Sequence, residues 1–162
     1  MINEIDVEIL KILQHNARTS NAEISRQVGL APSAVFERLR KLEEKGIVRG
    51  YRVEIDPRAV GLAQLAFIFV RSNEGAGGVQ TADRIAQIPE VLEVHHVAGE
   101  DCFLVKVRAE DAEAVGRLLR EKLGRISSIT STRTTIVLET VKETAALPLG
   151  DLAEEETEAK RA

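Results

Sequence analysis

The chain has 162 residues, of which 44% are hydrophobic and 30% charged, and its formal net charge at pH 7 is -4. This length leaves room for two small domains, and the composition is that of a globular protein rather than a disordered or membrane-spanning one. A single cysteine, Cys102, excludes a disulfide within the chain. Aromatic residues make up only 3%, which excludes the base-stacking surface of a typical single-strand binder.

The first predicted element is a helix that begins after Asn3, a residue type that caps helix N-termini. Behind it, Ile5, Ile9, Ile12 and Leu13 recur at helical spacing. This apolar stripe predicts a helix that closes one side of a small core.

Residues 20–46 contain two further short helices joined by a tight turn. Ser20 and Glu23 have the spacing of a capping box, and Gly29 stands where a helix end needs a residue that tolerates positive φ. Pro32 suits the first position of the next helix, because no N–H is needed there. The pattern is a helix-turn-helix and indicates DNA binding.

The second of these helices has a polar face opposite the stripe of Val35, Leu39 and Leu42. Between residues 31 and 52 there are six Lys and Arg against three Glu, whereas residues 1–56 as a whole have nine of each sign. A local positive excess favours contact with phosphates, although an ordinary solvated helix of mixed charge is the alternative. The residues predicted to face DNA are Ser33, Ala34, Glu37, Arg38, Arg40, Lys41, Arg49 and Arg52.

Residues 47–57 are two β-prone runs interrupted by Gly50, which predicts the hairpin of a winged helix. Arg49 and Arg52 flank its turn, within reach of the DNA backbone. The linker DPRAVG follows, so we place a first domain at residues 1–60.

After the linker the periodicity changes, and residues 61–145 predict a second domain. Strands are predicted at 62–70, 91–98, 102–107 and 126–141, and helices at 74–87 and 112–123. This order is the split βαβ, or ferredoxin-like, βαββαβ arrangement, so the fold class is α+β. Such a sheet leaves one face bare, and a second copy of the chain is the expected cover.

Other candidate chemistry is weak. His95 and His96 are neighbours on a predicted strand, so their side chains point to opposite faces and do not readily share a metal ion. Cys102 has no recognisable base nearby, and the glycines at 75–78 are not followed by GKS or GKT. We find no catalytic set and expect no enzyme, no metal and no cofactor.

The last segment, residues 146–162, is acidic and predicts either a short helix or a disordered tail. No signal peptide or membrane-spanning run is recognisable. We therefore expect a cytoplasmic, nucleoid-associated protein with no membrane partner.

The whole chain resembles the Lrp/AsnC family of leucine-responsive, or feast/famine, transcription factors from about Ile5 to Lys142. The resemblance is carried by IDVEILKILQHNAR, ISRQVGLAPSAVFERLRKLEEKGIVRGY, DPRAVG, HHVAGEDCFLVKV and TRTTIVL, in that order. It implies a winged helix-turn-helix followed by an ACT-like (RAM) domain. It also implies dimers that assemble into octamers or other rings, and an amino acid or related metabolite bound between dimers.

The resemblance places the effector around the turn that begins at Gly99. A glycine turn exposes N–H groups that can hold a carboxylate, while Asp101 or Glu100 could hold an ammonium. The family often has an acid where this chain has Cys102, so an ordinary solvated turn is the alternative. The predicted effector residues are Gly99, Glu100, Asp101, Cys102, Thr132 and Thr134.

The sequence therefore predicts a regulator that binds double-stranded DNA at a palindromic site, as a homodimer or a higher assembly such as an octamer. A small-molecule effector, an amino acid or related metabolite, would modulate assembly and DNA binding. The alternative is a metabolite-sensing oligomerisation module without specific operator recognition.

Overall fold

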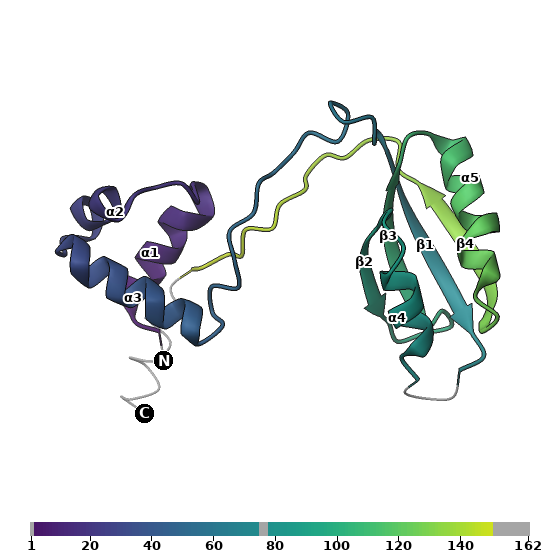
Figure 1. The fold of residues 1–162 in the computed structure, drawn as a ribbon, viewed down its shortest axis with the longest axis horizontal. Coiled ribbons are helices and arrows are strands. Elements are labelled where there is room, and N and C mark those ends of the chain that lie inside the picture. The colour runs from purple at the N-terminus through teal and green to yellow at the C-terminus, as the bar shows by residue number, and fades with distance from the viewer. Residues whose placement is uncertain (1, 75–77, 151–162) are drawn as a thin grey trace. The chain divides into compact units, whose positions relative to one another are not determined.

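The computed structural model describes residues 2–74 and 78–150, which form two compact units (Figure 1). A helical unit contains the described residues up to Glu54 together with residues 143–150, and a sheet unit spans Ile55–Lys142. The acidic tail predicted at residues 146–162 stays a prediction, because residues 151–162 lie outside the described residues. Residues 143–150 belong to the helical unit. No helix of the described ranges is long and apolar enough to cross a membrane.

The helical unit contains α1 (Glu4–His15), α2 (Asn21–Val28) and α3 (Pro32–Glu44). The predicted helix boundaries are confirmed by their caps. Asn3 Oδ1 accepts the Asp6 N–H at 3.0 Å, and Ser20 Oγ accepts the Glu23 N–H at 3.2 Å. Gly29 ends α2 with a φ of 68°, and Pro32 is the first residue of α3.

One half of the predicted capping box at Ser20 does not form. The Glu23 carboxylate does not return to the Ser20 N–H but accepts hydrogen bonds from Arg26 and Gln27. These bonds hold the pKa of Glu23 below its ordinary value. The exposed carboxylate therefore prefers donors one turn along its own helix.

The core of the helical unit is small. Its buried side chains come from all three helices, which fixes them as a bundle. They are Ile9, Ile24, Val35, Leu39 and Leu42.

The predicted hairpin at residues 47–57 is wrong, since residues 49–56 carry no strand. The N–H groups of Ile47 and Val48 instead donate to the Leu42 carbonyl, at 2.9 and 3.1 Å, and close the end of α3. An isolated two-stranded ribbon is only marginally stable in water, and this segment has no third strand beside it. Arg49 and Arg52 consequently lie on an exposed, irregular segment.

The sheet unit has the predicted βαββαβ order. Its elements are β1 (Gln64–Ser72), α4 (Gln80–Ala86), β2 (Val91–His96), β3 (Phe103–Ala109), α5 (Ala112–Glu121) and β4 (Ile129–Ile136), with a short 3-10 turn at Leu123–Arg125. The strands pair antiparallel in the order β2-β3-β1-β4. This is the ferredoxin-like topology that the sequence predicts.

Both helices cover one face of this sheet. Ile68 and Val105 point to that face and share a buried cluster with Ile85 of α4 and Val115 of α5. The opposite face, which we call the open face, carries the alternate residues of each strand. Among them is Phe69, which remains half-buried.

The predicted boundaries of the sheet unit differ by a few residues from the observed ones, and two of them are clearly wrong. The helix predicted from residue 74 begins only at Gln80, and the Glu74 carboxylate accepts the Thr81 N–H in the first turn of that helix, at 3.1 and 3.2 Å. The strand predicted to residue 141 ends at Ile136. Leu138, which follows the end of the strand, is 95% exposed and is therefore not packed in the core of this unit.

Candidate functional site

The outer face of α3 is a row of polar side chains at helical spacing. Ser33, Glu37 and Lys41 follow one another at intervals of four residues and are all exposed. Ala34 lies at the border of this row and is half-buried. Val35, Leu39 and Leu42 point the other way, into the core, so the row faces away from the bundle, while Phe36 of the same helix is 55% exposed.

Arg40 stands beside this row with its charge balanced. Its Nη2 lies 2.9 Å from Glu37 Oε2, and its Nη1 lies 2.6 Å from Glu44 Oε1. The hydrogen bond to Glu37 and the nearby charges of both glutamates hold the pKa of Arg40 above its ordinary value. Two carboxylates thus face one guanidinium, and the positive excess predicted for α3 is smaller than a count of residues suggests.

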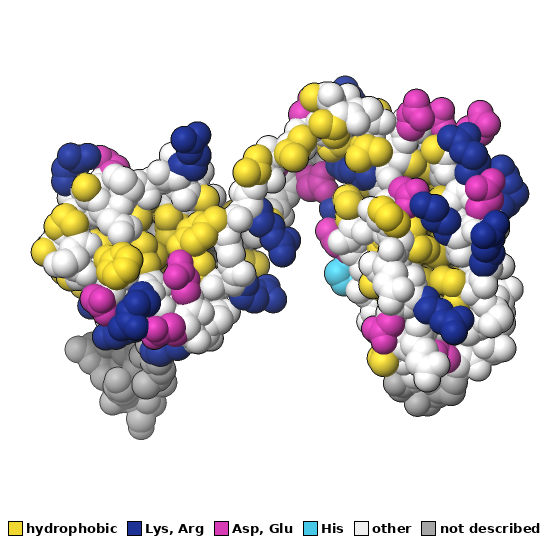
Figure 2. Space-filling view, in the orientation of Figure 1, with side chains coloured by type: hydrophobic (Ala, Val, Ile, Leu, Met, Phe, Trp, Pro, Cys, Tyr) yellow, Lys and Arg dark blue, Asp and Glu magenta, His cyan; other side chains and the backbone are white. Residues whose placement is uncertain are grey.

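Lys41 is different from Arg40. Its side chain is exposed, and within the described ranges no carboxylate is paired with it. On the face shown in Figure 2, some Lys and Arg side chains of the helical unit lie beside Asp and Glu, and others stand apart from them. An unneutralised Lys41 on the outer row is therefore the strongest positive feature that α3 presents.

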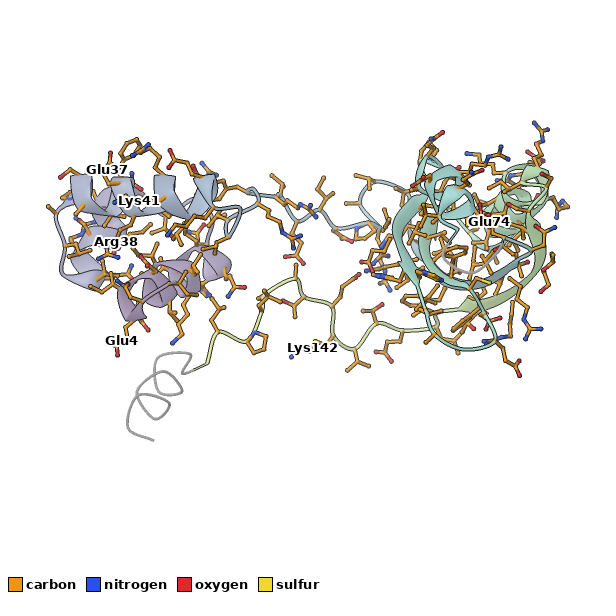
Figure 3. All side chains as sticks on the ribbon, turned by 90° about the horizontal axis from the view of Figure 1, so that it is seen from below. Glu4, Glu37, Arg38, Lys41, Glu74 and Lys142 are labelled. Carbon is orange, nitrogen blue, oxygen red and sulfur yellow. The ribbon has the colours of Figure 1, made fainter. Side chains whose placement is uncertain are left out.

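Arg38 lies on the side of α3 that faces α1 (Figure 3). Its Nη1 donates to Asp6 Oδ1 at 2.7 Å and to Asn3 Oδ1 at 3.3 Å. The Arg38 side chain is 30% exposed and that of Asp6 is 13% exposed. Arg38 thus lies beside the outer row, as its predicted border position implies, but its guanidinium is bonded to Asp6, a partner that the sequence prediction missed.

The predicted effector turn is anchored to β1. Gly99 adopts a φ of 137°, a conformation that suits glycine. After the turn, the Cys102 N–H donates to the Val70 carbonyl at 2.9 Å, and Cys102 Sγ lies 3.4 Å from the Ser72 nitrogen. Cys102 thus holds the turn against the end of β1.

The two acids of the turn face two arginines that the sequence prediction missed. Asp101 lies 3.0 Å from Arg133 Nη2 and 3.4 Å from Arg71 Nε, and Glu100 lies 2.6 Å from Arg71 Nη2. The Arg133 guanidinium also stacks 3.9 Å from the ring centre of Phe69. A charged cluster of both signs therefore lies at this end of the open face.

The structure does not bring Thr132 and Thr134 into this cluster. Thr132 pairs with Val70 and Thr134 with Ile68, both of which point to the helix-covered face. Arg133, between them, points to the open face instead, since successive side chains of a strand alternate. The alternation in the run TSTRTT is the sequence signal that would have selected Arg133.

The two adjacent histidines point different ways, as predicted. His95 Nε2 lies 3.1 Å from Glu93 Oε2, whereas the His96 ring packs 5.2 Å from the ring of Phe103. The hydrogen bond from His95, followed by that from Lys106, holds the pKa of Glu93 below its ordinary value. Within the described residues, no group of three or more His, Cys, Asp and Glu is arranged to hold a metal ion.

Two family models match the chain. Residues 2–49 match a winged helix-turn-helix DNA-binding domain, and residues 65–147 match the Lrp/AsnC ligand binding domain. The first match lies within the helical unit, and the second covers most of the sheet unit and continues into the segment after Lys142 that belongs to the helical unit.

Similar curated proteins cover almost the whole chain. The HTH-type transcriptional regulator FL11 of Pyrococcus horikoshii is 39% identical over 148 residues, which are 91% of this chain and 97% of that protein. The leucine-responsive regulatory protein of Escherichia coli is 36% identical over 148 residues, 90% of each chain.

Solved structures agree with this similarity. The complex of the Neisseria meningitidis transcriptional regulator NMB0573 with L-Met has a TM-score of 0.87 at 32% identity and covers 93% of this chain and 98% of that one. Escherichia coli AsnC has a TM-score of 0.84 at 28% identity and covers 90% and 98%.

Proposed function

Because this chain belongs to the Lrp/AsnC family of transcriptional regulators, with a helix-turn-helix and a ligand-binding domain, we propose that the outer face of α3 reads the major groove of its operator. The observation that carries the proposal is the exposed row of Ser33, Glu37 and Lys41. A recognition helix in the groove presents such a row to base edges. The regulator would act in the cytoplasm, on the nucleoid.

The side chains of the row suit different contacts. Lys41 can bind a phosphate or a guanine, and Ser33 and Ala34 are small enough for α3 to approach the bases closely. Glu37 can accept a hydrogen bond from the amino group of cytosine, and Arg40 can bind guanine once it leaves its glutamates. Exposed ion pairs are weak because solvent screens them, so Arg40 can exchange partners at small cost.

Arg49 and Arg52 would bind the sugar-phosphate backbone. Both are exposed on the irregular segment after α3, and this support does not require the predicted hairpin. Such contacts place a protein on DNA without reading its sequence.

Lys41→Gln tests the face assignment, with Lys11→Gln on α1 as a control that removes the same charge. A duplex selected by the unmodified protein from a random-sequence pool and a scrambled duplex of equal length serve as probes. We expect Lys41→Gln to weaken binding and to lower the salt slope of log affinity by about 1 if Lys41 binds a phosphate. If Lys41 binds a base, the loss falls on the selected duplex alone.

Equal behaviour of the two lysine variants would contradict the proposed face. A protein that binds neither duplex, or that never discriminates between them, would instead favour the alternative of an oligomerisation module without operator recognition. The attempt to select a preferred duplex therefore distinguishes the regulator from the oligomerisation module before any variant is made.

We further propose that a second copy covers the open face, giving a homodimer that binds a palindromic site, and that dimers assemble further, for example into octamers. The support is that Phe67, Phe69 and Leu104 lie on this face only half-buried, with both helices on the other side. A paired sheet would bury these side chains and hold two copies of α3 apart by a fixed distance, as a palindromic site requires.

An amino acid or a related metabolite would bind at the charged cluster beside the Gly99 turn. Its carboxylate would bind the guanidinium of Arg71 or Arg133, and its ammonium would bind the carboxylate of Asp101. The ligand would thus replace the ion-pair partners that these side chains have in the cluster. The L-Met complex of the Neisseria meningitidis regulator is consistent with a ligand of this class.

Sedimentation with and without a panel of amino acids tests both proposals. We expect at least one amino acid to shift the distribution of assemblies, because an effector acts only if its affinity differs between them. Asp101→Asn should abolish that shift, whereas Asp83→Asn, at an exposed position of α4, should retain it. A single subunit under all conditions would contradict the dimer, and an unchanged profile across the panel would contradict the effector.

A further inference from the structure

A network of hydrogen bonds joins α3 to the first turn of α1. Arg38 Nη1 is shared between Asp6 Oδ1, at 2.7 Å, and Asn3 Oδ1, at 3.3 Å. The same Asn3 oxygen accepts the Asp6 N–H, and Asp6 Oδ2 accepts the Asn3 N–H at 3.1 Å. The guanidinium of α3 is therefore bonded to the complete capping box of α1.

This contact is more enclosed than the other ion pairs of α3. The Asp6 side chain is only 13% exposed, whereas the side chains of Arg40, Glu37 and Glu44 are each about half exposed, at 47%, 52% and 56%. If Arg38 turned outward, it would leave a nearly buried carboxylate without its cation, which is far more costly than opening an exposed pair.

The small core explains why the contact matters. Five buried apolar side chains, with partly buried ones packed around them, hold three helices together, and apolar contacts are not directional. A charge-assisted hydrogen bond is directional and short, so it fixes the rotation of α3 about its own axis more closely than apolar packing alone does. Lys41 lies three residues from Arg38, close enough for the rotation of one to set the position of the other.

We propose that Arg38 is a positioning residue: through Asp6 and Asn3 it fixes the orientation of the outer row of α3 for specific DNA recognition and does not itself contact DNA. The proposal rests on the assignment of α3 as the recognition helix. It makes Asp6, an acid on a different helix, a determinant of operator affinity.

Asp6→Asn tests the proposal because the two roles of Arg38 predict opposite signs. If Arg38 contacts DNA, removing the acid frees the guanidinium and removes a negative charge, so binding should tighten or stay the same. If Arg38 positions α3, binding to the selected duplex should weaken by about tenfold, the change expected from loss of one charge-assisted hydrogen bond. Asparagine retains an oxygen for the Asn3 N–H, so the cap is kept.

Three further variants complete the experiment, all in the full chain. Arg38→Gln and the double variant should each weaken binding to the selected duplex by about the same tenfold, because two residues of one network act as a unit. Glu8→Gln removes the same charge from α1 at an exposed site and should leave affinity unchanged. On the scrambled duplex, Arg38→Gln should retain the salt slope of the unmodified protein.

An unchanged or tighter complex with Asp6→Asn would overturn the proposal, and so would a salt slope on the scrambled duplex lowered by about 1 in Arg38→Gln, which would make Arg38 a direct phosphate contact. If circular dichroism shows that Asp6→Asn has lost helix, the salt slope of Arg38→Gln decides. The Lys41→Gln test is independent, so failure of the face assignment and failure of the positioning role give different results.

Discussion

The helical unit and the sheet unit reach a defined structure by different means. Five buried apolar residues form the core of the helical unit, whereas thirteen form that of the sheet unit. The ion pair nearest to burial in the helical unit, Arg38 with Asp6, is 30% and 13% exposed. In the described part of the sheet unit, Lys106 with Glu93 is 14% and 45% exposed. Polar contacts thus weigh more in the helical unit because its buried cluster is the smaller of the two.

The difference bears on function. A small core whose helices are oriented by hydrogen bonds can be disturbed by loss of a single contact, and the DNA-reading row is part of that core's outer surface. The sheet unit can vary its surface charges, including the cluster around Asp101, without losing its fold. We therefore expect effector specificity to change more easily than DNA-binding geometry.

Truncating the core of the helical unit should have the largest effect. Ile24 is fully buried in α2, and Ile24→Ala should cost about 2 to 5 kcal/mol, from lost burial and the cavity left behind. Since the core has few other members, we expect α1 to α3 to lose protection against amide hydrogen exchange, while β1 and β3 keep theirs.

Ile85→Ala is the matched change in the sheet unit, where Ile85 is also fully buried. It should cost a similar free energy per residue, but the twelve remaining core residues should keep β1 and β3 protected at neutral pH. Loss of protection in both units with either variant would mean that they unfold together, and the contrast between them would fail.

A glycine pair should give a smaller effect of opposite sign in the two units. Gly29→Ala forces a side chain into a φ of 68°, with nothing within 4 Å of the added carbon. The cost is therefore conformational, about 1 to 2 kcal/mol. It should appear as a lower free energy of unfolding of the helical unit in urea.

Gly116→Ala in α5 is the counterpart. The added carbon meets only the end of the flexible Arg120 side chain, at 3.3 Å, and alanine favours a helix interior by about 1 kcal/mol. The variant should stabilise the sheet unit by up to about that amount. If Gly29→Ala were neutral, Gly29 would not be needed to end α2.

Local sequence signals were enough for most of the fold. Asn3, Ser20, Gly29 and Pro32 act on backbone groups within a few residues, so their roles in the helix boundaries are readable without a structure. The order of strands and helices in the sheet unit likewise follows from periodicity. The segment at residues 47–57 misled, because β-prone residues form a hairpin only where a neighbouring surface supports it.

The site was less predictable because it depends on distant pairs. Arg38 has the spacing of a border residue on α3, and nothing nearby indicates that Asp6 lies against it. Arg133 and Asp101 are likewise separated in the chain and meet only once the strands pair. Only the alternation of side chains along β4 distinguishes Arg133 from Thr132 and Thr134 as a member of the cluster. To use that alternation, one must know which face of the sheet is open.

The smallest predicted effect concerns one ion pair of the sheet unit, between Lys122 and Glu90. Lys122 Nζ lies 2.5 and 2.7 Å from the two oxygens of Glu90, and this hydrogen bond holds the pKa of Glu90 below its ordinary value. Glu90→Gln should lower the free energy of unfolding by less than about 1 kcal/mol at pH 7, because solvent screens the pair.

The pH dependence gives the sign. A carboxylate whose pKa is lower in the folded state stabilises the fold above its unfolded pKa, about 4.3 for glutamate, and loses that effect as the pH falls through the folded value. Urea unfolding should therefore show a difference between Glu90→Gln and the unmodified protein at pH 7 that shrinks steadily below about pH 4.3. A difference that stays constant down to acid pH would mean that Glu90 acts through packing, and that the sheet unit does not depend on this charge at all.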